Sequence, residues 1–319
     1  MGTTYSIRYR PASGCPTPQE MQRLIDDELD RVNLQMSTYR NDSELSRFND
    51  SRSTDWISVS AETAYVVDLA QQIAIASDGA FDVTVGPLVN LWGFGPDGRK
   101  DQVPSADEVD AAKKIVGYKN LDVRLEQPAL KKSLPELRVD LSAIAKGHGS
   151  DRVSGLLKAN GVEHSFVEIG GEIVTRGNRV DNQPWQIGIE APLDFERSIQ
   201  TVIGISGAAL ATSGNYRNFF LRDGQRFSHT IDPSTGRPVT HQLASASVVA
   251  DNCDLADAIA TCIMVLGPIE GLRLAEAKDW SVLLMHQDGN AMITTYSKRF
   301  AKCFPEVCNK FTSSKVGQP

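Results

Sequence analysis

Apolar residues recur at helical spacing in three long segments of the chain. The first segment, residues 17–32, opens with Thr17-Pro18-Gln19-Glu20, which has the form of a capping box with proline at the first helical position. The second follows a serine cap and covers residues 60–77, and the third covers about 254–265. These patterns predict three helices, and a further helix is expected before Asp279.

Short apolar runs bounded by turn residues predict the strands. The predicted strands cover residues 3–9, 137–141, 164–169, 172–175, 185–190, 280–285 and 291–296. Gly170-Gly171 bends the chain between two strands of a predicted meander that continues to 185–190, and Asp288-Gly289 lies in the turn of a terminal hairpin. The strand at 137–141 leads into a helix that ends at Asn160-Gly161. Helices and strands are intermixed without strict βαβ alternation, which favours an α+β fold with mixed or antiparallel sheets and two intimately associated subdomains.

The polar segments between these elements predict loops. Residues 37–49 are expected to form a loop and a short helix, and 79–95 tight turns around an aromatic wall that contains Trp92 and Phe94. The polar stretch 96–110 is a candidate surface excursion within a single domain covering residues 1–319. The polar end, residues 310–319, is expected to be frayed.

Composition narrows the class of protein. The 319 residues are 41% apolar and 23% charged, as in ordinary globular proteins. A net charge of -7 argues against a general nucleic-acid binder, but it leaves room for an anionic nucleotide bound through a metal or backbone amides. No run approaches 18 uninterrupted apolar residues, so no membrane-spanning helix is predicted.

The N-terminal residues and the cysteines bear on the cellular compartment. Residues 1–30 lack the charged and apolar regions of a signal peptide, so we expect either a cytosolic protein or a leader that was removed. Met1 opens directly into a strand-like segment, which favours removal. Cys303 and Cys308 could form a small disulfide in an oxidising compartment or remain two thiols.

Asp257 and Thr261 are candidates for binding a metal ion. At this spacing a carboxylate and a hydroxyl lie on one face of the third predicted helix, and a hard divalent cation prefers such oxygen ligands. Asp254 could join them or only favour the helix N-terminus. The alternative for an isolated pair is a solvated or capping carboxylate and a core threonine.

His229 is a candidate general base. It precedes the turn Asp232-Pro233-Ser234-Thr235-Gly236, in which proline fixes φ and glycine permits a positive φ. A rigid turn of this kind can hold the imidazole in one orientation, as a base requires. The alternative is a structural histidine that donates to a backbone carbonyl.

The segment from Asp140 to Gly149 is a third candidate. A carboxylate ends the predicted strand, a small-residue turn follows, and Lys146 lies between alanine and glycine. A backbone carbonyl in this turn could bind a cation, although an ordinary strand-to-helix connection has the same form. The chain has neither a P-loop nor a GxGxxG motif. Trp92 and Phe94 could stack on a flavin or adenine, or could belong to the core.

Taken together, these segments resemble the ApbE family of FAD:protein FMN transferases over most of the chain, from Met1 to about Leu266. Eight markers stand in family order. They are Met1-Gly2-Thr3, Met36 to Tyr39 with Asp42 to Asn49, Gly79 to Asp82, Asp140 to Gly147, Gly170 to Glu172, Ser213-Gly214, His229 to Pro233, and Asp257 to Thr261. The resemblance implies Mg²⁺-dependent transfer of FMN from FAD to a threonine or serine hydroxyl of an acceptor flavoprotein, with release of AMP.

The resemblance also implies roles for individual residues. Asp257 and Thr261 match side-chain metal ligands, Ala143 matches a main-chain ligand, and His229 matches the base that deprotonates the acceptor hydroxyl. The positions that match FAD-binding residues are Met1, Tyr39, Ala80, Phe81, Asp82, Asp140, Lys146 and Ile231. His148 stands where the family is expected to have an aromatic residue.

Members of this family are usually exported, often as lipoproteins, so a periplasmic protein anchored to the inner membrane in its full-length form is expected; it would be cytoplasmic if Met1 is the true start. The acceptor is expected to be a subunit of a redox membrane protein. The residues leave two alternatives open. One is a pyrophosphatase that splits FAD into FMN and AMP, and the other is a non-catalytic exported flavin-binding protein.

Overall fold

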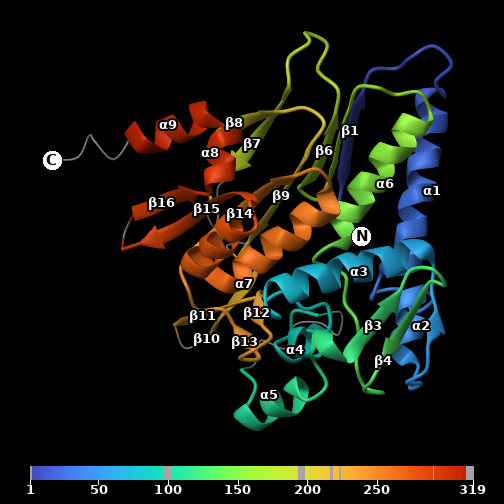
Figure 1. Cartoon of the computed structure of the whole chain (residues 1–319), viewed down its shortest axis with the longest axis vertical. Coiled ribbons are helices and arrows are strands. Elements are labelled where there is room, and N and C mark those ends of the chain that lie inside the picture. The colour runs from blue at the N-terminus through green and yellow to red at the C-terminus, as the bar shows by residue number, and fades with distance from the viewer. Residues whose placement is uncertain are drawn as a thin grey trace.

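The computed structural model describes residues 2–95, 103–192, 198–215, 218–222, 224–289 and 291–313, and its centre is a seven-stranded antiparallel sheet (Figure 1). Its strands, in spatial order, are β1 (Tyr5–Tyr9), β5 (Ser165–Ile169), β6 (Glu172–Arg176), β9 (Ala209–Gly214), β14 (Leu243–Ala250), β15 (Ser281–Asp288) and β16 (Ala291–Tyr296). Strands remote in sequence, β6 with β9 and β9 with β14, are neighbours here, so the sheet joins both halves of the chain.

Four small sheets accompany the large one. They pair β2 (Ile57–Ser58) with β4 (Ala129–Lys132) and β4 with β3 (Leu121–Arg124), β7 (Trp185–Glu190) with β8 (Ile199–Ile205), β10 (Phe219–Arg222) with β11 (Gln225–Ser228), and β12 (Ile231–Asp232) with β13 (Arg237–Pro238). The predicted meander is therefore wrong in its last strand, because β7 pairs with β8 and β6 pairs with β5 and β9.

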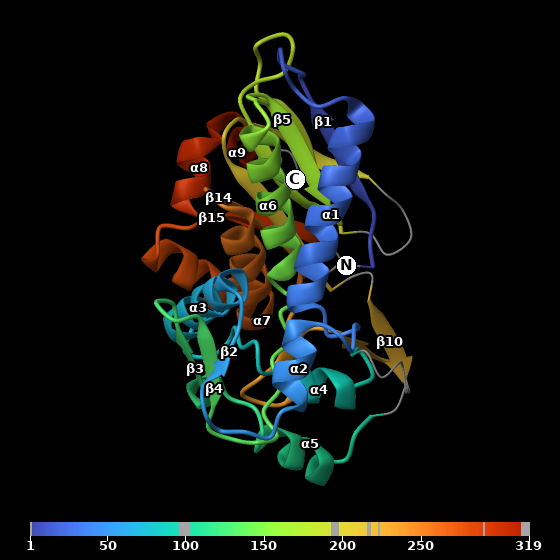
Figure 2. The same cartoon turned by 90° about the vertical axis from the view of Figure 1, so that its right-hand side faces the viewer.

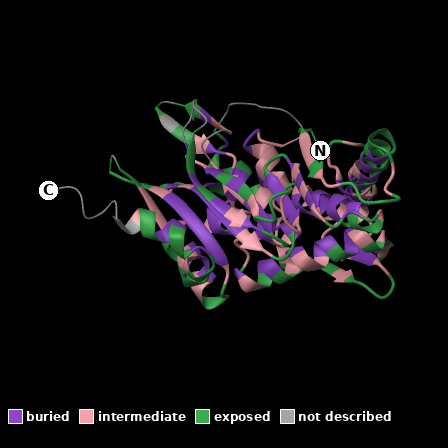
Figure 3. Cartoon of the chain, turned by 90° about the horizontal axis from the view of Figure 1, so that it is seen from above, coloured by how far each residue is buried: buried purple, intermediate pink, exposed green. Residues whose placement is uncertain are grey.

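The helices cover the sheet and build the lower part of the molecule in Figure 1. They are α1 (Pro18–Met36), α2 (Glu44–Asp50), α3 (Ala61–Ala76), α4 (Gly86–Leu91), α5 (Ala106–Lys113), α6 (Ala145–Ala159), α7 (Cys253–Ala277), α8 (Lys298–Cys303) and α9 (Pro305–Ser313), with a 3₁₀ turn at Tyr118–Asn120. Figure 2 shows α1 and α6 side by side along one face of the sheet, where they contact each other. Figure 3 shows that buried residues are concentrated in this interior.

The sheet has apolar side chains on both faces because it is covered on both. Along β15, Val282 and Leu284 pack in the core that contains α7, whereas Leu283 and Met285 pack with β7, β8, α8 and α9 on the other face. Side chains alternate between the faces of a strand, so this near-continuous apolar run is what a doubly covered strand requires.

Several predicted boundaries are confirmed. Thr17 caps α1 in a capping box with Glu20, Ser60 caps α3, and residues 44–50 form the short helix expected after the first loop. The terminal hairpin forms as β15 and β16. The predicted α+β fold class is confirmed.

The strand predicted at residues 137–141 is wrong. Among the residues that the structure describes, this segment pairs with no strand, because a side chain occupies its backbone groups: Asn49 donates to the Val139 carbonyl (2.8 Å) and accepts from the Val139 N–H (2.7 Å). The Asp140 N–H donates to the Val83 carbonyl at 2.7 Å. These contacts fix the segment that delivers Asp140 to the turn before α6.

The chain's remaining structural predictions concern its ends and excursions. Residues 96–102 and 314–319 lie outside the described residues, whereas α5 begins at Ala106 and α9 extends to Ser313, so parts of the predicted excursion and tail are helical. No disulfide joins Cys303, which is exposed, to Cys308, which is buried.

Helix α7 is long and apolar enough to cross a membrane by length and composition alone. Its environment shows a core helix instead: it packs against β14, β9 and α6, it carries the buried carboxylates Asp254 and Asp257, and it is kinked at Gly267 (φ 81°) before Pro268. The helix predicted over about 254–265 and the one predicted before Asp279 thus lie on either side of this kink, within one continuous element.

Candidate active site

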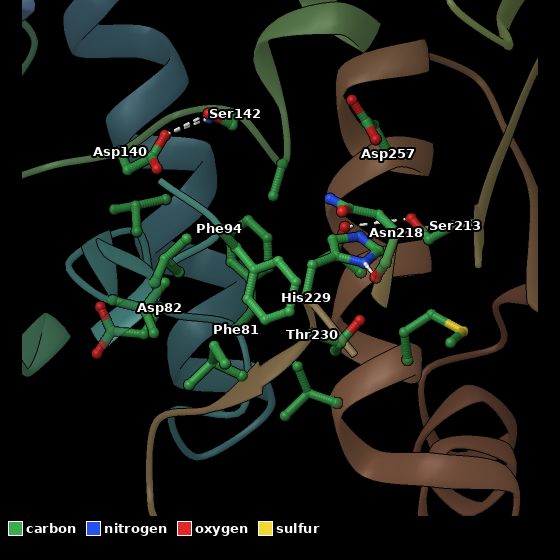
Figure 4. A pocket seen from close by; sticks show the side chains of 18 of the residues that line it. Phe81, Asp82, Phe94, Asp140, Ser142, Ser213, Asn218, His229, Thr230 and Asp257 are labelled. Atoms are coloured by element: carbon green, nitrogen blue, oxygen red, sulfur yellow. Dashed lines mark hydrogen bonds between the residues drawn. The ribbon is translucent and has the colours of Figure 1, made fainter. Parts of the chain in front are cut away.

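A cavity of about 460 Å³ lies where the start of α6, the first half of α7, β9 and the segments 80–95 and 229–233 converge. The tight turns predicted over 79–95 are only partly right, because residues 86–91 of this segment form α4. Figure 4 shows side chains from these elements around one space, with Asp257 on α7 and the Asn218 side chain drawn between it and the His229 ring. A cavity of this size, with apolar walls and a few converging polar groups, has the features of a small-molecule site.

The cavity contains nearly all of the residues that the sequence singled out. The predicted site residues that line it are Tyr39, Ala80, Phe81, Asp82, Asp140, Ala143, Lys146, His229, Ile231, Asp257 and Thr261. Met1, the remaining one, lies outside the described residues. The structure thus brings together positions that are as far apart in the chain as Tyr39 and Thr261, but it does not by itself assign their roles.

A lysine and two carboxylates form the charged part of the cavity. The Lys146 Nζ donates to Glu172 Oε1 at 2.7 Å and lies 3.5 Å from Asp257 Oδ2. Glu172 is 3% exposed and Asp257 is 2% exposed. Asp257 Oδ2 also accepts the Gly147 N–H at 3.1 Å. Glu172 is a site residue that sequence reasoning did not assign, although it ends the Gly170-Gly171-Glu172 marker.

Burial and mutual charge shift the pKa values of this cluster. Burial raises the pKa of Asp257, against the effect of the nearby Lys146. Burial, with the charge of Asp257, raises the pKa of Glu172, and the charge of Lys146 opposes this rise. Burial alone would lower the pKa of Lys146, but the charges of Asp257 and Glu172 outweigh it and the pKa lies above its usual value. The ammonium is therefore charged at neutral pH, and its charge favours the ionised forms of the two neighbouring carboxylates.

A close helix contact makes this cluster possible. A Cβ built on Gly147 would come within 2.3 Å of the Cys253 carbonyl oxygen, so only glycine lets α6 approach the start of α7 this closely. The same approach brings the Gly147 N–H within hydrogen-bonding distance of Asp257. The small-residue turn noted in the sequence thus serves a packing requirement.

Three oxygen-bearing groups could hold a magnesium ion. The Asp257 carboxylate and the Thr261 hydroxyl come from successive turns of α7, and Ala143 lies in the turn before α6. Thr261 Oγ1 has a hydroxyl neighbour, Ser213 Oγ at 3.2 Å. Mg²⁺ takes oxygen ligands and few of them from protein, so this donor set fits it. Among the described residues, no group of three or more His, Cys, Asp and Glu side chains is placed to hold a metal.

His229 is held by the start of the β10–β11 hairpin. Its Nδ1 lies 3.0 Å from the Asn218 carbonyl oxygen, which also accepts the His229 main-chain N–H at 3.1 Å. Because a carbonyl can only accept, Nδ1 carries the proton and Nε2 is left with its lone pair. Burial lowers the pKa of His229. The imidazole is thus neutral and oriented, which fits a base.

The predicted turn after His229 is confirmed. Asp232 Oδ1 accepts hydrogen bonds from the N–H and hydroxyl of Ser234, at 2.8 Å and 2.7 Å, and the Gly236 N–H donates to the Asp232 carbonyl. Gly236 has a φ of 71°. The Trp92 indole donates to the Gly236 carbonyl at 2.8 Å, which anchors the turn to α4's end.

Two other acidic residues of the cavity order turns. Asp82 Oδ1 accepts from the N–H and hydroxyl of Thr84, and its Oδ2 accepts from the Tyr118 N–H, all between 2.7 and 2.8 Å. Burial raises the pKa of Asp82. Asp140 Oδ1 accepts from the N–H and the hydroxyl of Ser142, as Figure 4 shows. Both carboxylates therefore shape the cavity wall whatever else they bind.

The aromatic residues divide between wall and core. Phe94 lines the cavity, stacks with Phe220 at 5.6 Å and meets the His229 ring edge-on at 6.3 Å. Trp92 is buried and stacks with Phe227, so it belongs to the core. Tyr39, 70% exposed, stands at the rim.

His148 does not reach the cavity. It lines a second hollow with Tyr65, Asp151 and Asp254, its Nδ1 is 3.5 Å from Asp254 Oδ2, and neither ring nitrogen has a hydrogen-bond partner among the described residues. His148, which stands where an aromatic residue was expected, thus lies outside the cavity.

Comparison with known proteins agrees with this geometry. The family profile described as "ApbE family" matches residues 1–284. The chain is 48% identical over 285 residues to a Vibrio cholerae protein named FAD:protein FMN transferase, covering 89% of this chain and 85% of that one. It is 40% identical over 302 residues to the Escherichia coli protein of the same name, covering 94% and 86%.

A solved structure gives the same answer for the fold. The flavin transferase ApbE from Vibrio cholerae superposes with a TM-score of 0.88 at 45% identity, covering 95% of this chain and 96% of that one. The α+β fold of this chain is thus shared with a flavin transferase. This chain belongs to the ApbE family.

Proposed function

We propose that this protein transfers FMN from FAD to a serine or threonine hydroxyl of an acceptor flavoprotein, in a reaction that depends on Mg²⁺ and releases AMP. The observation that carries the proposal is the meeting, in one cavity, of an oriented neutral imidazole and an oxygen donor set suited to magnesium. The relatives named as FAD:protein FMN transferases support it.

FAD would lie in the cavity with its diphosphate near Lys146. The predicted FAD-binding residues on the walls are Tyr39, Ala80, Phe81, Asp82, Asp140 and Ile231. Lys146 supplies a positive charge that a diphosphate needs when it leaves water. The apolar walls exclude water, which strengthens this attraction and limits hydrolysis.

Mg²⁺ would be held by Asp257, Thr261 and the main-chain oxygen of Ala143. When bound, it neutralises the phosphate oxygens and stabilises the AMP leaving group. The protein's own part is to supply few ligands, so that phosphate oxygens and water fill the other positions.

His229 would act as the general base. Its Nε2 takes the proton of the acceptor hydroxyl, whose oxygen then forms a bond to the phosphorus of the FMN half of FAD. The bond from that phosphorus to the bridging oxygen breaks, and the bridging oxygen leaves with AMP. The lowered pKa keeps the imidazole unprotonated at neutral pH, so it can accept this proton without first losing another.

The test is to incubate the protein with FAD, Mg²⁺ and an acceptor flavoprotein, and to follow AMP release and flavin fluorescence of the acceptor on a denaturing gel. Equal amounts of AMP and covalently bound flavin support transfer. Rapid AMP release without acceptor would support a pyrophosphatase, and tight FAD binding without turnover would support a flavin-binding protein. A periplasmic, membrane-anchored location and a redox membrane protein as acceptor remain part of the proposal, and fractionation of cells would test the location.

A further inference from the structure

Glu172 draws the Lys146 ammonium away from Asp257. The Nζ–Oε1 distance to Glu172 is 2.7 Å, a short charge-assisted hydrogen bond, whereas Nζ lies 3.5 Å from Asp257 Oδ2, a longer and weaker contact. Asp257 Oδ2 accepts instead from the Gly147 main chain. One partly buried cation thus lies between two buried carboxylates and forms its shorter contact with the one that is not a proposed metal ligand.

The position of Glu172 is fixed by the same helix that carries Lys146. Glu172 begins β6 directly after Gly170 and Gly171, whose φ angles are 62° and 103°. Ser150, one turn along α6 from Lys146, donates its hydroxyl to the Glu172 carbonyl at 3.0 Å. Glu172 Oε2 is buried and has no hydrogen-bond partner, so among the described residues this carboxylate is hydrogen-bonded to Lys146 alone.

Without Glu172, Asp257 would be the remaining carboxylate beside the ammonium. Opposite charges attract strongly in a buried site, so Lys146 would close the gap to Asp257 and compete with any cation for the same oxygen. The Lys146 side chain would then also point away from the space in which a diphosphate would lie. Glu172 can thus serve the site by holding Lys146, without binding the metal itself.

We propose that Glu172 is a positioning residue that keeps Lys146 off Asp257, so that Asp257 remains available to a divalent cation and Lys146 to the FAD diphosphate. This inference rests on the proposed function for the identity of the substrate. The competing explanation is that Glu172 acts on the cation directly. The two differ in one respect: only the first requires Lys146 to be present.

A double-variant cycle separates them. Wild type, Glu172→Gln, Lys146→Met and the double variant are each titrated with Mn²⁺ in the presence of one equivalent of FAD, and free Mn²⁺ is measured by electron paramagnetic resonance. Glu172→Gln keeps the shape of the side chain and removes its charge. Glu126→Gln, the same change at an exposed position between β3 and β4, is the matched control and should leave the affinity unchanged.

We expect Glu172→Gln to weaken Mn²⁺ binding by about tenfold or more, the size typical of groups that orient metal ligands. In the Lys146→Met background the same change should have less than about a threefold effect, because the competing ammonium is gone. Equal losses in both backgrounds, or no loss in either, would overturn the proposal.

Two further measurements keep the result interpretable. Thermal unfolding checks that each variant folds, and Glu172→Asp, which keeps the charge, should lose less Mn²⁺ affinity than Glu172→Gln; an equal or greater loss in a folded protein also contradicts the proposal. A wild type that binds FAD and Mn²⁺ but transfers no flavin would defeat the proposed function and leave this cycle readable.

Discussion

The contact between α6 and α7 at Gly147 has a charged cluster on each side, and the two clusters differ in what occupies their polar atoms. On the cavity side, Lys146 lies between Glu172 and Asp257. On the other side, Asp254 lies near His148 and Asp151, in a hollow that shares none of these residues with the cavity. Two helices thus present buried charge in opposite directions within a few residues.

In the second cluster, the Asp151 carboxylate is hydrogen-bonded to the protein backbone. Both oxygens of Asp151 accept the Cys253 N–H, and one also accepts the Asp254 N–H, so this carboxylate caps the start of α7. The carboxylates of the cavity cluster have fewer such bonds. Asp257 accepts one backbone N–H, and Glu172 Oε2 has no hydrogen-bond partner among the described residues. The two sides thus differ in their carboxylates: Asp151 caps a helix, whereas Asp257 and Glu172 face the cavity with fewer backbone bonds.

The largest effect should come from removing the charge on the cavity side of α7. Asp257→Asn should slow flavin transfer by roughly 10³-fold or more, equivalent to about 4 kcal/mol of transition-state stabilisation. The cause is the loss of a carboxylate ligand for the cation that neutralises the diphosphate. The measurement is covalent flavin on the acceptor per unit time at saturating Mg²⁺.

Asp254→Asn is the matched control, because it makes the same change one helical turn earlier on the other side. Its transfer rate should stay within about threefold of wild type. If the two variants lose the same activity, the division into a functional and a structural side is wrong.

The two histidines should differ next most strongly. His229→Gln should slow transfer by about 10² to 10⁴-fold, the contribution typical of a general base, while the Kd for FAD changes little. His148→Gln should leave the rate almost unchanged, because His148 does not line the cavity. The transfer rates and FAD affinities of both variants are measured. If a loss of FAD affinity accounts for the whole effect of His229→Gln, His229 is not the general base.

The pH dependence of transfer should report His229. Burial lowers its pKa below the ordinary value of 6.5, so the rate should rise with pH below that value and be level above it. His229→Gln should lack this acidic limb. An acidic limb centred above pH 7 in the wild type would contradict an unprotonated base at neutral pH.

The structural cluster should appear in the pH dependence of stability. Burial and the charge of Asp254 raise the pKa of Asp151 to about 7, from 3.8 in the unfolded chain. Between these values the folded protein binds more protons than the unfolded one, so this group's contribution to the free energy of unfolding falls as pH rises from about 4 to 7. Asp254→Asn removes the neighbouring charge and should flatten this slope, as measured by urea unfolding at several pH values. An unchanged slope would mean that the two carboxylates do not interact.

The smallest effect should be a gain. His148 is 4% exposed with both ring nitrogens unpartnered among the described residues, and its ring lies 6.1 Å from that of Tyr65. His148→Phe removes buried polar atoms without bonds, so it should stabilise the protein by about 1 kcal/mol and leave transfer unaffected. Destabilisation would show that the contact with Asp254 contributes more than the desolvation costs.

Local sequence determined the elements whose signals lie within a few residues. The capping box at Thr17, the serine cap of α3 and the rigid turn after His229 are set by side chains that bond to their own neighbourhood, so they could be predicted and they form as predicted. The helical spacing of Asp257 and Thr261 could also be recognised in the sequence. The family markers then brought eleven described positions into one predicted site, and these positions line one cavity.

Only the tertiary structure decided which groups meet across the chain. No residue near Leu137 indicates that the Asn49 side chain forms the backbone hydrogen bonds that a partner strand would have formed. Likewise, the bond between Lys146 and Glu172 joins residues on different elements, and its place depends on how closely α6 packs against α7 at Gly147. Propensity and capping act over one or two turns of chain, whereas burial and charge act between surfaces that exist only once the chain has folded.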